Sequence, residues 1–228
     1  MKKWITTSGC TIYLVTKGRS NTYLVLDDDT SVLIDTGLKN SQKELMKKLD
    51  PLLGERNLSY LILTHTHFDH TGNAAMIKEN YKARIMVQES EANNLERGKT
   101  TIPQGTNPLT RLLVKIGRKI KYFNEYPHVE PDYLVGEKHL LTPKCYLIHT
   151  PGHSKGSMSL IVDNEVALVG DAMVGIFRWS VFPAFADDVP SMITSWEKLL
   201  KTGCNIFLPG HGTSNSRKLL EKQYKKYK

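Results

Sequence analysis

Residues 61–73 carry side chains that could bind metal ions. The segment reads Leu-Ile-Leu-Thr-His-Thr-His-Phe-Asp-His-Thr-Gly-Asn and places His65, His67, Asp69 and His70 within six residues. Neutral imidazole and carboxylate groups suit Zn²⁺, Fe²⁺ and Mn²⁺. In an extended chain His65 and His67 point to the same side, because side chains repeat every second residue. The turn that follows points Asp69 and His70 toward a neighbouring position, so one loop could bind two adjacent ions.

Three further candidate ligands lie downstream of this loop. His153, Asp171 and His211 each directly follow a glycine, and each comes after a short apolar run that reads as a buried strand. A glycine beside a ligand allows the backbone to turn tightly and to approach a metal closely. Two ions need more ligands than one loop supplies, and these three residues provide them.

This order of motifs resembles the metallo-β-lactamase-fold superfamily over about residues 11–218. The resemblance implies two metal ions bridged by Asp171. It also implies a first site of three histidines and a second of one aspartate and two histidines: His65, His67 and His153, and Asp69, His70 and His211. It further implies an αββα four-layer sandwich, in which two mixed β-sheets lie face to face with helices on both outer faces.

Two aspartates receive additional roles from this resemblance. Asp35, in Ile34-Asp35-Thr36-Gly37, matches a buried aspartate beneath the metal site, although the residues alone are also typical of a turn at a strand end. Asp69 is expected to bind one ion and to orient the attacking hydroxide, and it is therefore the predicted catalytic residue. The sequence assigns no substrate-binding residue.

Length and composition limit the classes of protein to which this chain could belong. The chain has 228 residues, of which 40% are hydrophobic, and we expect one domain over residues 1–228. No apolar run approaches the roughly 18 residues of a membrane-spanning helix. The apolar centre of the N-terminal segment is shorter than the roughly 7 to 15 residues of a signal peptide, and we expect a cytoplasmic protein. The three cysteines are spaced too irregularly for a metal or disulfide motif and are expected to be buried.

The net charge of +8 is concentrated in part near the C-terminus. Residues 217–228 contain six basic residues and one acidic residue. A solvated basic helix face explains this run without a nucleic-acid partner. We therefore expect a small-molecule substrate, and the sequence leaves the oligomeric state open.

The pattern of elements independently favours two similar halves. Strands are expected at residues 11–17, 22–26 and 31–35, then a helix that Ser41 caps and Pro51 ends. A strand at 59–64 precedes the histidine loop, and Thr71 is expected to cap the next helix. The second half repeats the theme with strands between 139 and 170, a helix at 191–202, a strand at 205–208 and a final helix capped by Ser214. Two halves with ligands at strand ends indicate two facing sheets.

Residues 98–130 interrupt this alternation of strands and helices and suggest an insertion at the rim of the cleft. A helix is expected over residues 109–122, with five leucines and isoleucines on one stripe. This stripe could pack on the protein's own domain, close over the site as a lid, or lie on a membrane surface. The aromatic segment at residues 173–190 begins just after Asp171 and is expected to wall the cleft.

The ligand set predicts a metallo-hydrolase. Two divalent ions would supply a metal-bridging hydroxide that attacks a thioester, lactone or related ester. Zn²⁺ is the expected metal, and iron and manganese are the alternatives. The sequences around His153 and His211 are similar to those of glyoxalase II and the lactonases, and Asp171 at the bridging position argues against a true β-lactamase. A phosphodiesterase or nuclease, and a mononuclear-iron sulfur dioxygenase, are the alternative predictions.

Overall fold

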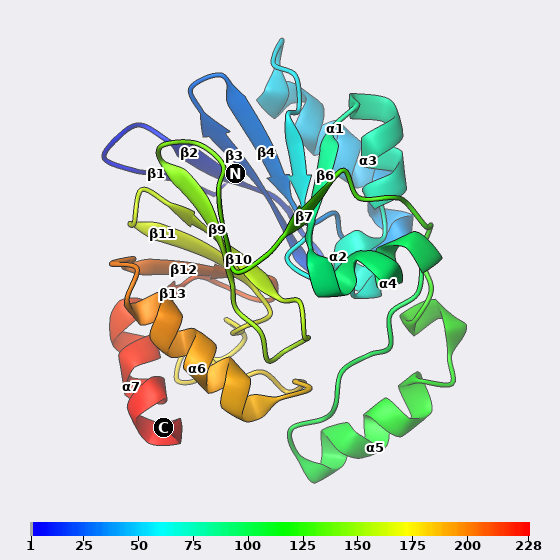
Figure 1. The fold of residues 1–228 in the computed structure, drawn as a ribbon, viewed down its shortest axis with the longest axis vertical. Coiled ribbons are helices and arrows are strands. Elements are labelled where there is room, and N and C mark those ends of the chain that lie inside the picture. Colours follow the sequence, from blue (N-terminus) through cyan, green and yellow to red (C-terminus); the bar gives the residue numbers. More distant parts are fainter. Residues whose placement is uncertain (1) are drawn as a thin grey trace.

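A computed structural model describes residues 2–228 and contains two β-sheets that face each other, with helices on their outer sides (Figure 1). The predicted αββα sandwich is confirmed. Within the described residues, none of the helices has both the length and the apolar character that crossing a membrane requires.

The first sheet contains seven strands in chain order. Neighbours from β1 to β4 are antiparallel, whereas those from β4 to β7 are parallel. The strands are β1 (Lys3–Ile5), β2 (Thr11–Lys17), β3 (Asn21–Asp27), β4 (Thr30–Ile34), β5 (Tyr60–Ile62), β6 (Arg84–Gln88) and β7 (Tyr133–Val135).

The second sheet contains six strands in the order β13-β12-β11-β10-β9-β8. All of its neighbours are antiparallel except β11 and β12. The strands are β8 (Lys138–Leu140), β9 (Cys145–His149), β10 (Met158–Val162), β11 (Val166–Gly170), β12 (Ile206–Pro209) and β13 (Asn215–Ser216).

The helices form the two outer layers and the edge of the site (Figure 1). They are α1 (Gln42–Leu53), α2 (Phe68–Thr71), α3 (Ala74–Tyr81), α4 (Ala92–Arg97), α5 (Pro108–Gly117), α6 (Val189–Leu200) and α7 (Arg217–Tyr227). Three short 3₁₀ helices are η1 (Lys39–Ser41), η2 (Glu89–Glu91) and η3 (Lys121–Phe123).

Alternating strand residues create three apolar layers between these elements. Along β4, Val32 and Ile34 face the second sheet, whereas Leu33 faces the helices that cover the first sheet. On the far side of the second sheet, the fully buried Trp196 of α6 packs in the same cluster as Phe207 of β12. This period of two is what allows each sheet to be covered on both faces.

Several expected helix ends are wrong. Pro51 lies inside α1 rather than after it, because Leu49 and Leu53 on either side of it are both buried in the core and hold the last turn. The Ser41 hydroxyl donates to Leu38 O instead of capping α1. Thr71 ends α2 and donates to His67 O, so it caps no helix.

The C-terminal helix and two strands also differ from expectation. Ser216, not Ser214, caps α7 by accepting the Leu219 N–H. Strands β1 and β7 were not expected, because each has only three residues and lacks a clear alternating pattern. The expected helix over residues 109–122 is shorter: Asn107 begins α5 with a reciprocal cap to Thr110, and η3 follows separately.

Candidate metal centre

All seven predicted ligands converge at one edge of the two sheets. Four of them come from the segment after β5, where two histidines precede α2 and the others lie within it. The remaining three follow β9, β11 and β12. The side chains form overlapping clusters whose ligand atoms lie within 4.8 Å of one another: His65, His67 and His153; His65, His70 and Asp171; and Asp69, His70 and His211.

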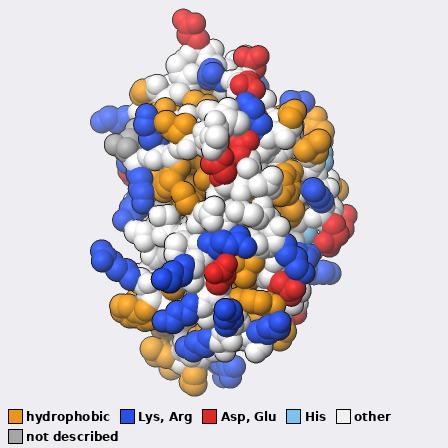
Figure 2. All heavy atoms as spheres, turned by 90° about the vertical axis from the view of Figure 1, so that its left-hand side faces the viewer, with side chains coloured by type: hydrophobic (Ala, Val, Ile, Leu, Met, Phe, Trp, Pro, Cys, Tyr) orange, Lys and Arg blue, Asp and Glu red, His pale blue; other side chains and the backbone are white. Residues whose placement is uncertain are grey.

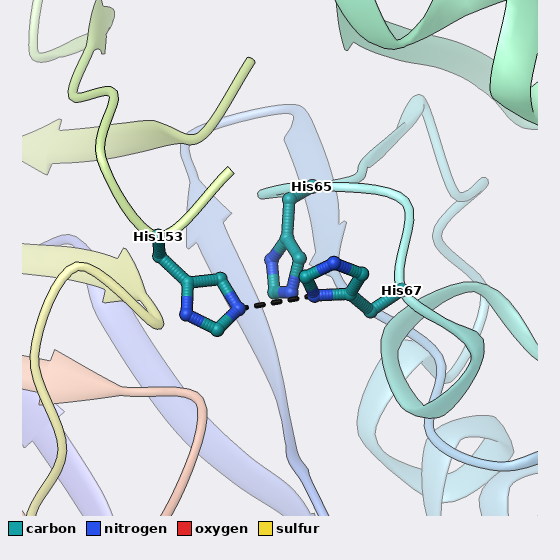
Figure 3. A group of neighbouring side chains, drawn as sticks. All are labelled: His65, His67 and His153. Carbon is teal, nitrogen blue, oxygen red and sulfur yellow. Dashed lines mark hydrogen bonds between the residues drawn. The ribbon is translucent and has the colours of Figure 1, made fainter. Parts of the chain in front are cut away.

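The first triad consists of His65, His67 and His153, whose rings point toward one another (Figure 3). His153 Nε2 lies 3.0 Å from His67 Nδ1, and the ring of His65 stands 4.5 Å and 4.8 Å from those of His67 and His153. His153 Nδ1 donates to Phe185 O at 2.9 Å, which leaves Nε2 without a proton and facing the cluster.

The second triad consists of Asp69, His70 and His211. His70 Nε2 lies 3.4 Å from His211 Nε2, which in turn lies 3.6 Å from Asp69 Oδ2. His211 Nδ1 donates to Arg19 O at 2.6 Å, so its Nε2 also faces the cluster. In His211, as in His153, the ring nitrogen that points away from the cluster donates to a backbone oxygen, and this hydrogen bond fixes the orientation of the ring.

Asp171 lies between the two triads. Its Oδ2 is 3.5 Å from His153 Nε2 and 3.1 Å from His211 Nε2, and its Oδ1 is 3.5 Å from His70 Nε2. Burial alone would raise the pKa of Asp171, but the neighbouring His211, His70 and His153 outweigh it and hold the pKa well below its ordinary value. The carboxylate is therefore ionised in the form that binds cations.

Burial sets the charge of the first triad. It is the main cause that lowers the pKa of His65 well below its ordinary value, lowers that of His67, and lowers that of His153 to about 4. Neutral imidazole is the form that ligates metal, so these rings need to lose no proton at neutral pH.

His70 behaves differently because of Asp35. Burial alone lowers the pKa of His70, but Asp35 and Asp171 outweigh it and raise the pKa to about 10. Asp35 Oδ2 lies 2.8 Å from His70 Nδ1, and the same carboxylate accepts both the Thr64 N–H and the Thr64 hydroxyl. Asp35 is buried, with a backbone φ of 58°, a left-handed conformation that aspartate tolerates better than most residues.

Gly210 allows the second triad to close. A Cβ atom at this position would lie 2.4 Å from Asp171 Oδ1 and 2.6 Å from His70 Cε1. Gly170, with a φ of 49°, similarly leaves room for the Thr64 side chain. The glycines next to these ligands therefore serve close packing in the described structure, in agreement with the sequence argument.

Glu91 of η2 is a buried carboxylate that the sequence did not single out. It accepts hydrogen bonds from the Thr66 hydroxyl, the Ser154 hydroxyl at 2.6 Å, Asn94 Nδ2 at 3.1 Å and Gly156 N at 3.2 Å. Thr66 lies between two histidines of the first triad and Ser154 follows the third, so Glu91 ties both loops together. Only the fold reveals it, since a glutamate near a helix start is ordinarily exposed.

A pocket of about 510 Å³ opens above the two triads. Five of the seven candidate ligands line it: His67, Asp69, His153, Asp171 and His211. The rest of its wall is mostly apolar and comes from α2, α5, η3 and residues 174–185: Phe68, Leu113, Ile116, Phe123, Val174 and Phe185. The aromatic segment after Asp171 thus contributes to this wall.

Arg19 supplies a positive charge at the same pocket and was also missed by the sequence argument. Its Nε lies 3.5 Å from Asp69 Oδ2, and its guanidinium stacks 5.1 Å from the ring of Phe68 and 5.4 Å from that of Phe123. Among the described lining residues it is the sole lysine or arginine. No local motif marks it, because Arg19 lies in a turn far from the other residues in sequence.

The apolar stripe expected over residues 109–122 is largely exposed. Val114 is buried, but Leu109, Leu112, Leu113 and Ile116 are each more than half exposed. The helix is therefore attached along one side only, and its apolar stripe faces the pocket mouth and the solvent.

Two buried polar atoms are suited to binding a cation. Within residues 2–228, His65 Nε2 and Asp171 Oδ1 have no hydrogen-bond partner, although both are shielded from solvent. Unpaired buried acceptors are unfavourable unless something binds them. Both atoms belong to the ligand clusters, and their imidazole and carboxylate chemistry suits a divalent metal.

The other histidines and the cysteines lie outside this site. His149 pairs with Glu137 at 2.9 Å, away from both triads. All three cysteines are buried free thiols, as expected. Cys10 and Cys145 approach Asp27, but burial is the main cause that raises their pKa values to about 12 and about 11, which keeps the thiols protonated, and Lys144 Nζ lies 3.2 Å from Asp27 Oδ1.

Comparison with known families agrees with this geometry. The model of the metallo-β-lactamase superfamily matches residues 15–211, which include all seven ligand positions. The chain belongs to the metallo-β-lactamase superfamily. The resemblance inferred from the histidine loop is thereby confirmed.

Two curated relatives are matched over most of their own length. A probable metallo-hydrolase of Methanocaldococcus jannaschii is 26% identical over 201 residues, covering 87% of this chain and 90% of that protein. A probable metallo-hydrolase of Streptococcus pyogenes is 28% identical over 205 residues, covering 86% and 80%. These names agree with the predicted enzyme class, a metallo-hydrolase of this superfamily.

A solved structure supports the fold. The archaeal metallo-β-lactamase superfamily protein from Sulfolobus tokodaii superposes with a TM-score of 0.68 at 21% sequence identity, covering 94% of this chain and 85% of that one. At this level of identity the likeness concerns the arrangement of the sheets and helices.

Proposed function

We propose that this metallo-hydrolase uses two divalent cations to hydrolyse small thioesters, lactones or related esters. The position of Asp171 carries the proposal, since one carboxylate lies within 3.5 Å of histidines from both triads. A carboxylate in that position could bridge two ions, with His65, His67 and His153 on one and Asp69, His70 and His211 on the other. Zinc is the proposed metal, and the same ligand types accept iron and manganese.

A bound pair of divalent cations would lower the pKa of water toward neutrality and would polarise the carbonyl oxygen of the group under attack. The residues of the chain position the reaction. Asp69 lines the pocket, and its carboxylate would accept a hydrogen bond from the attacking water and hold its proton. Asp35 would keep the Nδ1 proton of His70 in place, so that Nε2 remains directed at the cluster.

The pocket wall supports an acyl substrate. Apolar side chains from α5 and residues 174–185 surround the ligand cluster and would exclude water from an ester or thioester bond. Arg19 could donate a hydrogen bond to one carbonyl or carboxylate group of the substrate. Inside the pocket, a phosphodiester group would meet a single arginine among the described lining residues, so the pocket lining itself favours an ester over a phosphodiester.

We further propose the glyoxalase II and lactonase branch, on the basis of the sequences around His153 and His211. The segment at residues 98–130 would be the insertion that shapes the rim of one domain, because α5 lines the pocket. The cytoplasm is the proposed location, which fits three free thiols.

The test combines metal quantitation with a substrate panel. We expect two metal ions per purified chain and turnover of short thioesters or lactones in preference to phosphodiesters. His67→Ala should abolish turnover, while His128→Ala, at an exposed histidine, should leave it unchanged. Full activity of His67→Ala would contradict the proposal.

Two results would select the alternatives. Preferential phosphodiester cleavage, together with RNA binding that weakens steeply with salt, would indicate a nuclease. One iron per chain with oxygen uptake in the presence of glutathione persulfide would indicate a sulfur dioxygenase.

A further inference from the structure

Seven large apolar side chains lie around the mouth of the pocket and are exposed to solvent. Four belong to α5 and three to the loop after β11, and each is between 51% and 69% exposed. We call them the rim face: Leu109, Leu112, Leu113, Ile116, Ile176, Phe177 and Trp179. The two parts flank the same opening, because the pocket is lined by Leu113 and Ile116 on one side and by Ile176, next to Phe177, on the other.

The leucines and the isoleucine of α5 are exposed because the helix packs on the rest of the protein along one side only. Thr110, Val114 and Gly117 form the buried side of the helix, and a Cβ at Gly117 would lie 2.7 Å from Ile102 Cδ1. The leucines project from the remaining surface and have no core to enter. A contiguous apolar surface of this kind usually marks an interaction site.

The charge around the rim face is of one sign. From residue 97 to residue 124 the sequence contains seven lysines and arginines and no aspartate or glutamate. Five of these cations flank the stripe and are exposed: Arg111, Lys115, Arg118, Lys119 and Lys121. Figure 2 shows the other side of the molecule, the side of α7, where Lys and Arg side chains also gather over the lower part.

The positive charge around the rim face distinguishes between the surfaces that could cover it. Two copies of the chain meeting through their rim faces would bring their cationic flanks together, and like charges repel. A bilayer that contains anionic phospholipids offers both an apolar interior and a negative surface. A tryptophan and a basic apolar helix are typical of segments that lie in the membrane interface.

We propose that the rim face docks on an anionic phospholipid bilayer. The apolar side chains of α5 and the 176–179 loop enter the boundary between headgroups and acyl chains, while the flanking lysines and arginines contact the phosphates. The mouth of the pocket then opens toward the membrane. If the proposed hydrolase function also holds, an acylated substrate would pass from the bilayer along Leu113 and Ile116 to the ligand cluster.

The test measures binding to vesicles in the absence of substrate, so it does not depend on the hydrolase proposal. The full-length protein is sedimented with vesicles of phosphatidylcholine alone and of phosphatidylcholine mixed with phosphatidylglycerol. We expect binding to the mixed vesicles that weakens with added salt, and much weaker binding to phosphatidylcholine.

Matched variants separate the rim face from general hydrophobicity. Leu109→Gln with Leu112→Gln should weaken binding by roughly tenfold or more. The control replaces Leu134 and Leu140, which are 58% and 67% exposed on β7 and β8, by glutamine and should bind like the wild type. None of these four leucines lines the pocket, and thermal midpoints and metal content should remain unchanged in both pairs.

A second matched pair tests the charge. Lys115→Gln with Lys119→Gln should weaken binding to mixed vesicles by roughly tenfold. Lys43→Gln with Lys47→Gln, two exposed lysines at the same spacing on α1, should have no such effect.

Three outcomes would overturn the proposal. The first is an absence of binding to mixed vesicles, and the second is an equal loss of binding in the control pairs. The third is a two-chain particle in sedimentation equilibrium that Leu109→Gln with Leu112→Gln converts to single chains, without vesicle binding. That result would assign the rim face to a second copy of the chain.

Discussion

On the floor of the pocket, the rings of His70, His153 and His211 each have one nitrogen paired with an oxygen, whereas on its rim α5 is attached along one side and presents leucines to solvent. The floor is built from strand ends, from glycines that allow close packing, and from buried carboxylates such as Asp35 and Glu91. The rim is built from a loop and a helix with few partners. The difference indicates that positions on the floor control metal binding and stability, while positions on the rim control which substrate or surface the protein meets.

The largest expected effect in this comparison comes from Asp35→Asn. Loss of the carboxylate removes the partner of His70 Nδ1, and substitutions of this kind typically reduce metal affinity by about 10- to 100-fold. Asparagine tolerates the left-handed backbone at this position, so the change acts on the hydrogen bond more than on the chain conformation. The measurement is metal content per chain during titration with a chelator.

Asp28→Asn is the matched control, because Asp28 also has a positive φ, of 44°, but is exposed. We expect its metal affinity to equal that of the wild type. Unchanged metal affinity in Asp35→Asn would show that the floor does not depend on this carboxylate.

Glu91→Gln should have an intermediate effect, on stability. Burial alone would raise the pKa of Glu91, but hydrogen bonds from Ser154 and Thr66 outweigh it and hold the pKa below its ordinary value of 4.5. A depressed pKa in the folded state contributes stability that is present above the unfolded-state pKa and is lost as the pH falls through the folded-state value. We expect Glu91→Gln to lower the free energy of unfolding by about 1 to 3 kcal/mol at pH 7, measured by urea unfolding.

The difference between Glu91→Gln and the wild type should begin to shrink as the pH falls below about 4.5, and it should be smallest below the depressed folded-state pKa, where both side chains are neutral. Glu89→Gln, at an exposed position of the same short helix, should change stability little at any pH. A Glu91→Gln protein as stable as the wild type at pH 7 would remove Glu91 from the set of residues that hold the floor.

The smallest effect is expected on the rim, from Ile116→Ala. This side chain lines the pocket but is 55% exposed, so its truncation should leave the thermal midpoint nearly unchanged. We expect KM for a long-chain acyl thioester to rise by roughly three- to tenfold, with little change for an acetyl thioester. Steady-state kinetics with both substrates provide the measurement.

Ile5→Ala serves as the control for Ile116→Ala, since Ile5 is 60% exposed on β1 and does not line the pocket. Equal kinetic effects of the two substitutions, or a large loss of stability in Ile116→Ala, would erase the distinction between floor and rim.

The sequence by itself determined the chemistry of the site and the layers of the fold. Histidines and aspartates at strand ends, with glycine beside them, indicate a candidate metal-ligating set, and alternating apolar residues indicate sheets covered on both faces. Such signals are local, because side-chain direction repeats with a short period along a strand.

Only the tertiary structure decided the partners of these residues. Glu91 and Arg19 reach the site from distant parts of the chain, Pro51 stays helical because the residues around it are buried, and the leucines of α5 face outward. Burial and pairing between distant segments depend on how the elements pack, and the periodicity of a single element is the same whether its apolar face meets a core or solvent.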